Sequence, residues 1–105
     1  MNFVDLFSLS LHRAVAEKML ADEGKVLSIA RENLERWLGS PSFATRGRRA
    51  LLEWKDILDR AKPDEIRRII TAETDEGQRL RSSSPFVGVL TEAERRKHFR
   101  ACAEV

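Results

Sequence analysis

The sequence predicts an all-α protein, a compact bundle of five to six short helices in a single domain spanning residues 1–105. Apolar side chains recur at intervals of three and four residues along most of the chain, which is the spacing of one helix face. No stretch alternates apolar and polar residues for long enough to indicate a strand. Cap and stop residues separate the periodic segments, and 105 residues is the size of one domain.

The first two helices are predicted on either side of a break at residues 22–24. The apolar stripe of the first helix recurs every fourth residue, at Phe7, Leu11, Val15 and Met19. Asp22 is placed to cap the second helix. The apolar face of that helix is formed by Leu27, Ala30, Leu34, Trp37 and Leu38. Gly39 and Pro41 then end it, since glycine at a helix end with proline shortly after is a stop signal.

A loop is predicted over residues 40–48, and a third helix follows it. One side of this helix is apolar, with Leu51, Trp54, Leu58 and Ala61 in line and Leu52 and Ile57 beside them. Pro63 opens a fourth helix, because the N–H that proline lacks has no intrahelical partner in the first turn. The buried edge of this helix is Ile66, Ile69 and Ile70.

Two further helices complete the predicted bundle. Thr74 caps a short fifth helix that ends near Arg81, where a serine run and Pro85 break the pattern. Thr91, followed three residues later by Glu94, is a capping box that opens a last helix. This helix runs toward the C-terminus of the chain.

The composition excludes several classes of protein. Hydrophobic residues make up 42% of the chain, which is too many for a disordered one. The single cysteine, Cys102, cannot form an internal disulfide, and no Cys/His group has metal-ligand spacing. The apolar N-terminal stretch is interrupted by His12 and Arg13 well before membrane-spanning length. We therefore expect a cytoplasmic protein with no cofactor, no metal and no membrane contact.

Charge is distributed unevenly, although the net charge is only +2. Residues 46–62 carry a local charge of +3, residues 63–77 carry −3, and residues 78–105 again carry +3. This alternation favours the docking of segments or protein partners over one continuous nucleic-acid surface.

Catalytic groups with plausible partners are missing from the sequence pattern. His12 has Ser8 and Ala16 one turn away, and neither is a carboxylate. Most carboxylates stand one helical turn from a basic residue, as Asp56 does from Arg60, which is typical of a solvated helix face. We therefore expect that the protein is not an enzyme. A minor activity that uses Cys102 or His98 is the weakest alternative.

Residues 79–90 are unusually apolar for a loop. Their apolar side chains must either cover the helical core or contact a partner, and the sequence leaves both alternatives open. The arginines and serines beside them resemble the polar rim of a small interface. The predicted partner-binding residues are Arg79, Arg81, Ser84, Pro85, Phe86, Val87 and Leu90.

Two basic clusters provide the second functional hypothesis, a small DNA-binding transcriptional regulator. Arginine-rich loops and helix ends bind phosphates in a salt-dependent way. The possible nucleic-acid-binding residues are Arg46, Arg48, Arg49, Arg95, Arg96, Lys97 and Arg100. A helix-turn-helix would use the fourth helix as its reader, but that helix begins with Asp64 and Glu65 at the end that approaches DNA. DNA is therefore the less favoured partner.

Four stretches resemble a family of small bacterial proteins that tend to be encoded just upstream of toxin genes and are regarded as antitoxins. They are LHRAVAEKMLAD at residues 11–22, VLSIARENLERWL at 26–38, LLEWKDIL at 51–58 and RLRSSSPFVGVLTEAERR at 79–96. The resemblance implies a helical antitoxin that neutralises its cognate toxin, a nucleotidyltransferase-type enzyme, by direct contact. It brings no catalytic residues with it. Residues 82–90 are the expected contact surface because of their apolar character.

Overall fold

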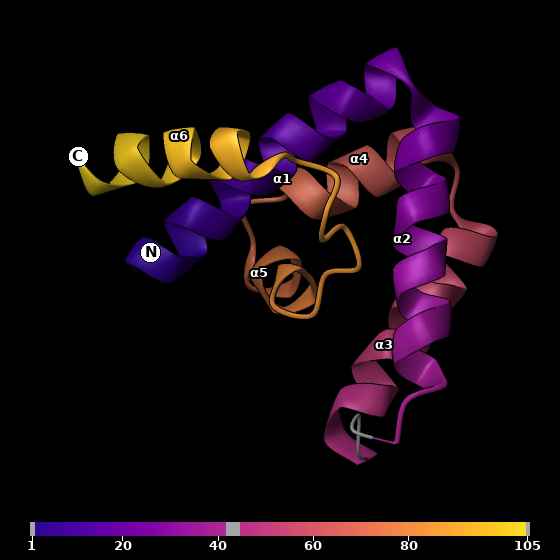
Figure 1. Ribbon diagram of the computed structural model, residues 1–105. Helices are drawn as coiled ribbons and strands as arrows, with labels where there is room; N and C mark the ends of the chain where they lie inside the picture. Colours follow the sequence, from indigo (N-terminus) through magenta and orange to yellow (C-terminus); the bar gives the residue numbers. More distant parts are fainter. Residues whose placement is uncertain (1, 42–44, 105) are drawn as a thin grey trace.

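The structure of the protein, a computed structural model, describes residues 2–41 and 45–104, apart from the side chains of residues 45 and 46. Within these ranges it is all-α, without a strand, which confirms the predicted fold class (Figure 1). The helices are α1 (Phe3–Ala21), α2 (Glu23–Leu38), α3 (Thr45–Arg60), α4 (Pro63–Thr71), α5 (Asp75–Arg81) and α6 (Glu92–Ala103).

Local capping sets three of the predicted helix starts. Asp22 accepts a hydrogen bond from the N–H of Lys25 at 3.2 Å and so begins α2. Thr74 caps α5 with its hydroxyl. Thr91 and Glu94 form the predicted capping box of α6, in which each side chain accepts a hydrogen bond from the other residue's N–H. These predictions are confirmed.

The start of α3 differs from the prediction, because the helix begins at Thr45 and not after residue 48. The single glycine of this stretch, Gly47, lies inside the helix, where one glycine is tolerated. Residues 42–44 of the predicted loop lie outside the described residues. Arg48 lies in this first part of α3 and donates a hydrogen bond to the carbonyl oxygen of Leu38 at 2.9 Å. It therefore places a cation at the C-terminal end of α2, where the helix dipole favours one.

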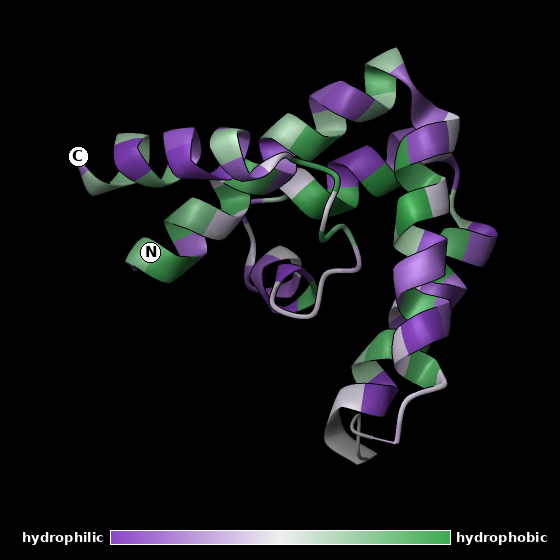
Figure 2. Ribbon diagram, in the orientation of Figure 1, coloured by the Kyte–Doolittle hydropathy of each residue, from purple (hydrophilic) through white to green (hydrophobic). Residues whose placement is uncertain are grey.

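The helices are arranged around α1, which packs against α2, α4, α5 and α6. On the other side of the molecule α2 pairs with α3 (Figure 1). The C-terminal helix α6 has α1 as its main neighbour, and the two chain ends lie on the same side of the fold (Figure 1). Green apolar and purple polar residues alternate along these helices, as expected for elements with one buried face (Figure 2).

The core is centred on Trp54, whose side chain is fully buried. Its indole N–H donates to the carbonyl oxygen of Leu80 at 2.9 Å, so the ring is buried without an unpaired donor. Trp37 is only partly buried. The other buried members of the core cluster are Val15, Met19, Val26, Ala30, Leu34, Leu51, Leu58, Ile66, Ile70, Leu80, Phe86, Val89 and Leu90.

Candidate functional site

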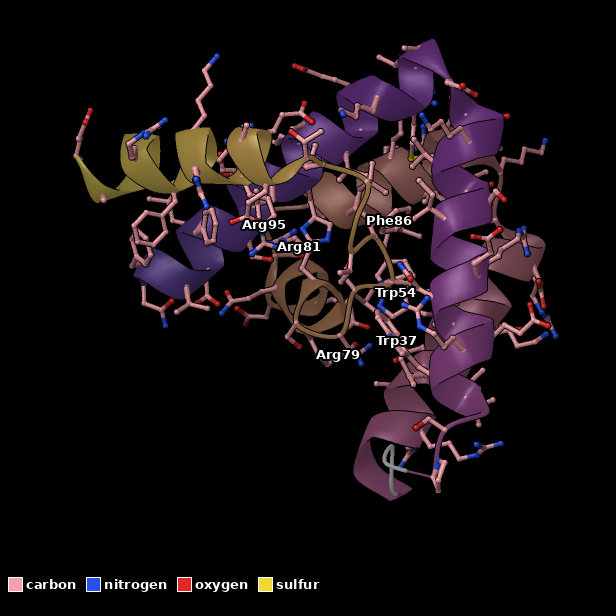
Figure 3. All side chains as sticks on the ribbon, in the orientation of Figure 1. Trp37, Trp54, Arg79, Arg81, Phe86 and Arg95 are labelled. Atoms are coloured by element: carbon pink, nitrogen blue, oxygen red, sulfur yellow. The ribbon has the colours of Figure 1, made fainter. Side chains whose placement is uncertain are left out.

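Residues 82–90, predicted as a contact surface, lie across the core. Pro85, Phe86 and Leu90 are buried, and Phe86 is only 5% exposed. The Phe86 ring meets Trp54 edge to face with centroids 5.8 Å apart, and both lie on the side of α2 that faces the centre of the molecule (Figure 3). Of the two alternatives that the sequence left open, covering of the helical core therefore holds for these three residues, and none of them is exposed for contact with a partner. Val87 is 52% exposed.

Asn33 on α2 explains how this loop can be buried. Its side-chain amide donates to the carbonyl oxygens of Pro85 at 2.8 Å and of Val87 at 2.7 Å. A buried loop must find partners for its backbone polar groups, and one asparagine supplies two of them. Asn33 is itself 6% exposed. Its position gave no signal in the sequence, because the partners lie more than fifty residues away.

Arg79, predicted as a partner-binding residue, is already engaged within the protein. Its guanidinium makes two hydrogen bonds of 2.8 Å to the carboxylate of Glu53, and it also pairs with Glu76 on its own helix. The hydrogen bond from Arg79 lowers the pKa of Glu53 below its ordinary value. Arg79 therefore ties α5 to α3.

Arg81 points inward, with only 4% of its surface exposed. Its Nη1 donates to the carbonyl oxygens of Ala72 at 2.7 Å and Ile70 at 3.3 Å, at the C-terminal end of α4. A cation is favoured there because the last carbonyls of a helix lack partners. Its Nε and Nη2 are buried without a hydrogen-bond partner, and burial lowers the pKa of Arg81.

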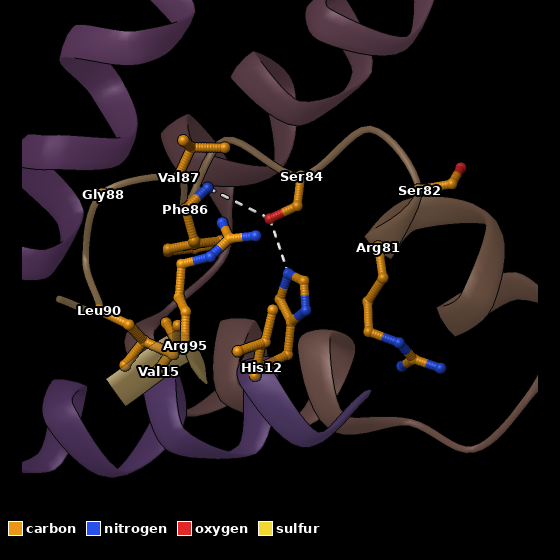
Figure 4. Close-up of a pocket in the computed structure, with 11 residues that line it drawn as sticks. His12, Val15, Arg81, Ser82, Ser84, Phe86, Val87, Gly88, Leu90 and Arg95 are labelled. Carbon is orange, nitrogen blue, oxygen red and sulfur yellow. Dashed lines mark hydrogen bonds between the residues drawn. The ribbon is translucent and has the colours of Figure 1, made fainter. Parts of the chain in front are cut away.

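His12 and Ser84 form a hydrogen-bonded pair at the centre of Figure 4. The His12 Nδ1 lies 2.7 Å from the carbonyl oxygen of Ser8, which can only accept, so Nδ1 carries the proton. Nε2 then accepts from the Ser84 hydroxyl at 2.7 Å, while Ser84 Oγ accepts from the N–H of Phe86 at 3.2 Å. Burial is the main cause that lowers the pKa of His12, and the charge of Arg81 adds to it.

The His12–Ser84 pair has the spacing of a base and a nucleophile, but its surroundings favour a structural role. The group that orients His12 is a backbone carbonyl, and among the described residues no carboxylate bonds to the ring. Burial and the nearby Arg81 both disfavour the imidazolium that a general base must become. We interpret the pair as a link between α1 and the buried loop.

A cavity of about 220 Å³ opens beside this pair, between α1, residues 84–90 and α6 (Figure 4). Its apolar lining includes Leu11, Val15, Phe86, Val87 and Leu90. Arg95 reaches into this lining from α6, and it makes no ion pair with any residue of the described ranges. Two arginines and no carboxylate occur among the described residues that line the cavity.

Helix α6 is held to α1 by two polar contacts. The ammonium of Lys18 lies 2.8 Å from a carboxylate oxygen of Glu94. This hydrogen bond, together with the one from the Thr91 N–H, lowers the pKa of Glu94 to about 2. The Ser10 hydroxyl lies 2.7 Å from Nδ1 of His98. His98 of α6 is therefore hydrogen-bonded to a serine of α1. No residue of α6 is buried.

Three phenylalanine rings fill the far end of the α1–α6 contact. Phe3 and Phe99 meet edge to face with centroids 5.2 Å apart, and Phe7 and Phe99 do so at 5.5 Å. The cluster remains half open, since Phe3 is 40% exposed, Phe99 is 48% exposed and the adjacent Val4 is 69% exposed. We call Phe3, Val4, Phe7 and Phe99 the aromatic edge. The sequence stripe identified Phe7, but it did not reveal that the two termini meet.

The two predicted basic clusters are not brought together. Arg48 and Arg49 are exposed near the start of α3, far from α6 in Figure 1, and the side chain of Arg46 lies outside the described residues. The second cluster is exposed along α6 and consists of Arg95, Arg96, Lys97 and Arg100. Arg96 faces Glu92 of its own helix at 3.6 Å. A single nucleic-acid surface that uses both clusters is therefore not supported.

Neither a metal centre nor a membrane span is found in residues 2–41 and 45–104. No three of their histidine, cysteine and acidic side chains are grouped so that they could hold a metal ion. None of the helices there combines the length and the apolar character that crossing a membrane requires. Cys102 on α6 is a free thiol of intermediate exposure.

Comparisons with protein-family models, with curated proteins and with solved structures give no significant match to this chain.

Proposed function

We propose that this chain is a protein-binding module and that the aromatic edge is its contact surface. The observation that carries the proposal is α6, a helix of 12 residues with no buried residue, lying on α1 beside half-exposed phenylalanine rings. Most helices of small proteins bury one face, because tertiary packing supplies most of their stability. A partner that covers this edge completes that burial.

The aromatic edge has the composition of an interface centre. Aromatic residues are enriched in the fully buried part of protein–protein contacts, and a few of them supply most of the binding energy. Exposed cations on the same helix, Arg96 and Arg100, would form a polar rim beside Phe99. This arrangement favours a partner with an apolar patch bordered by acidic side chains.

The class of the partner follows from the resemblance to small bacterial antitoxins. We propose that the protein neutralises a toxin enzyme, of nucleotidyltransferase type, by direct contact and without catalysis of its own. The small helical fold is consistent with this role. The aromatic edge fits a contact surface better than residues 82–90 do, because Phe86 of that segment belongs to the core.

Co-expression with the product of the adjacent gene tests this function. The wild-type chain is expected to co-purify with that product, and Phe99→Asp is expected to weaken the complex at least about thirtyfold, the equivalent of about 2 kcal/mol at an interface centre. Leu52→Asp is the matched control, since Leu52 is 46% exposed on α3 and lies outside the aromatic edge. Equal effects of the two substitutions would refute the proposed surface, and absence of any complex would refute the toxin partner.

Val87→Asp tests the remaining exposed part of the segment predicted from sequence. Val87 is 52% exposed, so its replacement leaves the core in place. Phe86→Asp cannot serve, because a charge beside buried Trp54 would unfold the protein instead of probing a contact. A loss of complex with Val87→Asp that matches the loss with Phe99→Asp would extend the contact surface to the loop.

Nucleic-acid binding is the second candidate function, and the exposed cations of α6 favour it. A gel-shift titration against the DNA upstream of the gene, at two salt concentrations, tests it. Binding through phosphates weakens steeply as salt rises. Lack of a shift at low salt would remove this candidate, because phosphate contacts are strongest there.

A further inference from the structure

We propose that the cavity between α1, residues 84–90 and α6 binds a small carboxylate that carries one aromatic ring or branched aliphatic group. This inference goes beyond the protein-binding function and does not depend on it. It rests on the size of the cavity, on its apolar lining and on Arg95, an exposed lining residue that forms no ion pair within the described part of the chain.

The size of the cavity limits the ligand to one ring with a short polar group. The cavity holds about 220 Å³. A cavity of about 150 Å³ in another protein accommodates benzene, whereas pockets for drug-sized ligands begin at about 300 Å³. A nucleotide is therefore too large to be enclosed here.

The chemistry of the walls favours an apolar body. Leu11 and Val15 of α1 line the cavity together with Phe86 and Leu90 of the loop at residues 82–90. The nearby polar pair offers a ligand little, because the Ser84 hydroxyl already donates to His12 and accepts from the N–H of Phe86. A ligand that enters thus gains mainly from burying its apolar part.

The charge of the cavity favours a carboxylate at its entrance. Arg95 is exposed, lines the cavity and has no carboxylate partner in the described part of the chain, so its guanidinium is available (Figure 4). Arg81 also lines the cavity, but its side chain is buried, its Nη1 donates to the end of α4, and its guanidinium points away from Arg95 in Figure 4. Arg95 is therefore the exposed cation of this site. One planar guanidinium fits the two oxygens of a carboxylate in a bidentate pair.

Titration of the isotope-labelled protein with phenylacetate, followed by amide NMR shifts, tests the proposal. Saturable shifts are expected at the amides of Val87 and Gly88, with a dissociation constant of about 1 mM for a ligand of this size. Phenylacetamide lacks the carboxylate charge of phenylacetate, and acetate lacks its ring. Both are expected to bind at least about tenfold more weakly than phenylacetate. Lack of saturable shifts with phenylacetate up to about 20 mM would overturn the site.

Two substitutions on α6 test whether Arg95 supplies the positive charge that binds the carboxylate of the ligand. Arg95→Gln is expected to lower phenylacetate affinity about tenfold, because it removes a charge-assisted hydrogen bond and leaves the cavity open. Arg96→Gln is the matched control, since Arg96 faces Glu92 and does not line the cavity. Equal losses in the two variants would mean general attraction to a basic helix and would overturn the proposal. Equal binding of phenylacetate and phenylacetamide would also overturn it, because the cavity would then recognise only the ring.

Discussion

At the scale of single residues, Ser84 illustrates how one hydroxyl holds a buried loop in place. The Ser84 hydroxyl donates a hydrogen bond to Nε2 of His12 and accepts one from the N–H of Phe86. Neither group has another hydrogen-bond partner within the described residues. We expect Ser84→Ala to lower the free energy of unfolding by about 1–3 kcal/mol, the cost of leaving buried polar groups unpaired. Urea denaturation followed by circular dichroism measures this change.

Ser82→Ala is the control for that measurement. Ser82 is exposed at the C-terminal end of α5, and its hydroxyl donates only to the carbonyl oxygen of Arg79 in the same helix. We expect its loss to change stability by less than about 0.5 kcal/mol. If the two variants were equally stable, the link between α1 and the loop would have no energetic role.

His12 makes folding stability depend on pH. Because burial lowers its pKa in the folded protein below the ordinary value of 6.5, the unfolded chain binds the proton more readily. Stability is therefore complete above pH 6.5 and falls as pH decreases below it, by at most about 1.4 kcal/mol per pH unit from this group. Urea titrations between pH 7 and pH 5 measure the slope, and His12→Gln should remove it. An unchanged slope in that variant would assign the pH dependence to other groups.

At the scale of elements, Gly77 determines how closely α5 approaches the end of α4. A Cβ added at Gly77 would lie 2.4 Å from the carbonyl oxygen of Ala72, a backbone atom that cannot move aside alone. We expect Gly77→Ala to destabilise the protein by about 1–3 kcal/mol, the usual cost of overpacking. Its thermal unfolding midpoint, compared with that of the wild type, measures the effect.

Gly24→Ala is the matched control, because a Cβ there meets no atom within 4 Å and the residue lies in α2. Alanine is favoured over glycine in a helix by about 0.5–1 kcal/mol, so this variant should be slightly more stable than the wild type. Destabilisation of similar size at both positions would show that the close approach to Ala72 is not the cause.

The elements also show which features a sequence reveals. Caps such as Asp22 and Thr91 act over three residues, so the helix starts that they define could be predicted from the chain alone. The burial of Phe86 could not be predicted in this way. It depends on the side chain of Asn33 on α2, which donates hydrogen bonds to the backbone carbonyl oxygens on either side of Phe86. The His12–Ser84 pair escaped detection for the same reason, since it joins residues 72 positions apart.

At the scale of the whole molecule, charge blocks that looked like partner surfaces are partly used inside the fold. Within the basic C-terminal block, Arg79 forms an ion pair with Glu53 of α3, and Glu94 forms one with Lys18 of α1. The exposed cations that remain in the C-terminal block lie on α6, the helix that carries Phe99 of the aromatic edge. The sequence could not predict the aromatic edge, because Phe3 and Phe99 meet only once the two termini lie together.

The packing of the molecule is therefore uneven, and this predicts uneven local stability. Helix α1 buries Leu9, Val15 and Met19, whereas α6 buries none of its residues. Segments with few buried contacts open at lower free-energy cost than core segments. We expect the amides of α6 to exchange with solvent at least about tenfold faster than those in the middle of α1, as measured by hydrogen exchange with mass spectrometry or NMR.

The same measurement on the complex links stability to function. A partner that covers the aromatic edge should slow exchange in α6 and leave exchange in α3 unchanged, because α3 lies on the other side of the fold (Figure 1). Equal exchange in α1 and α6 of the free protein would contradict the uneven packing. Protection that appears in α3 instead of α6 would place the partner on a different face, and the contact surface would then have to be sought around Leu52.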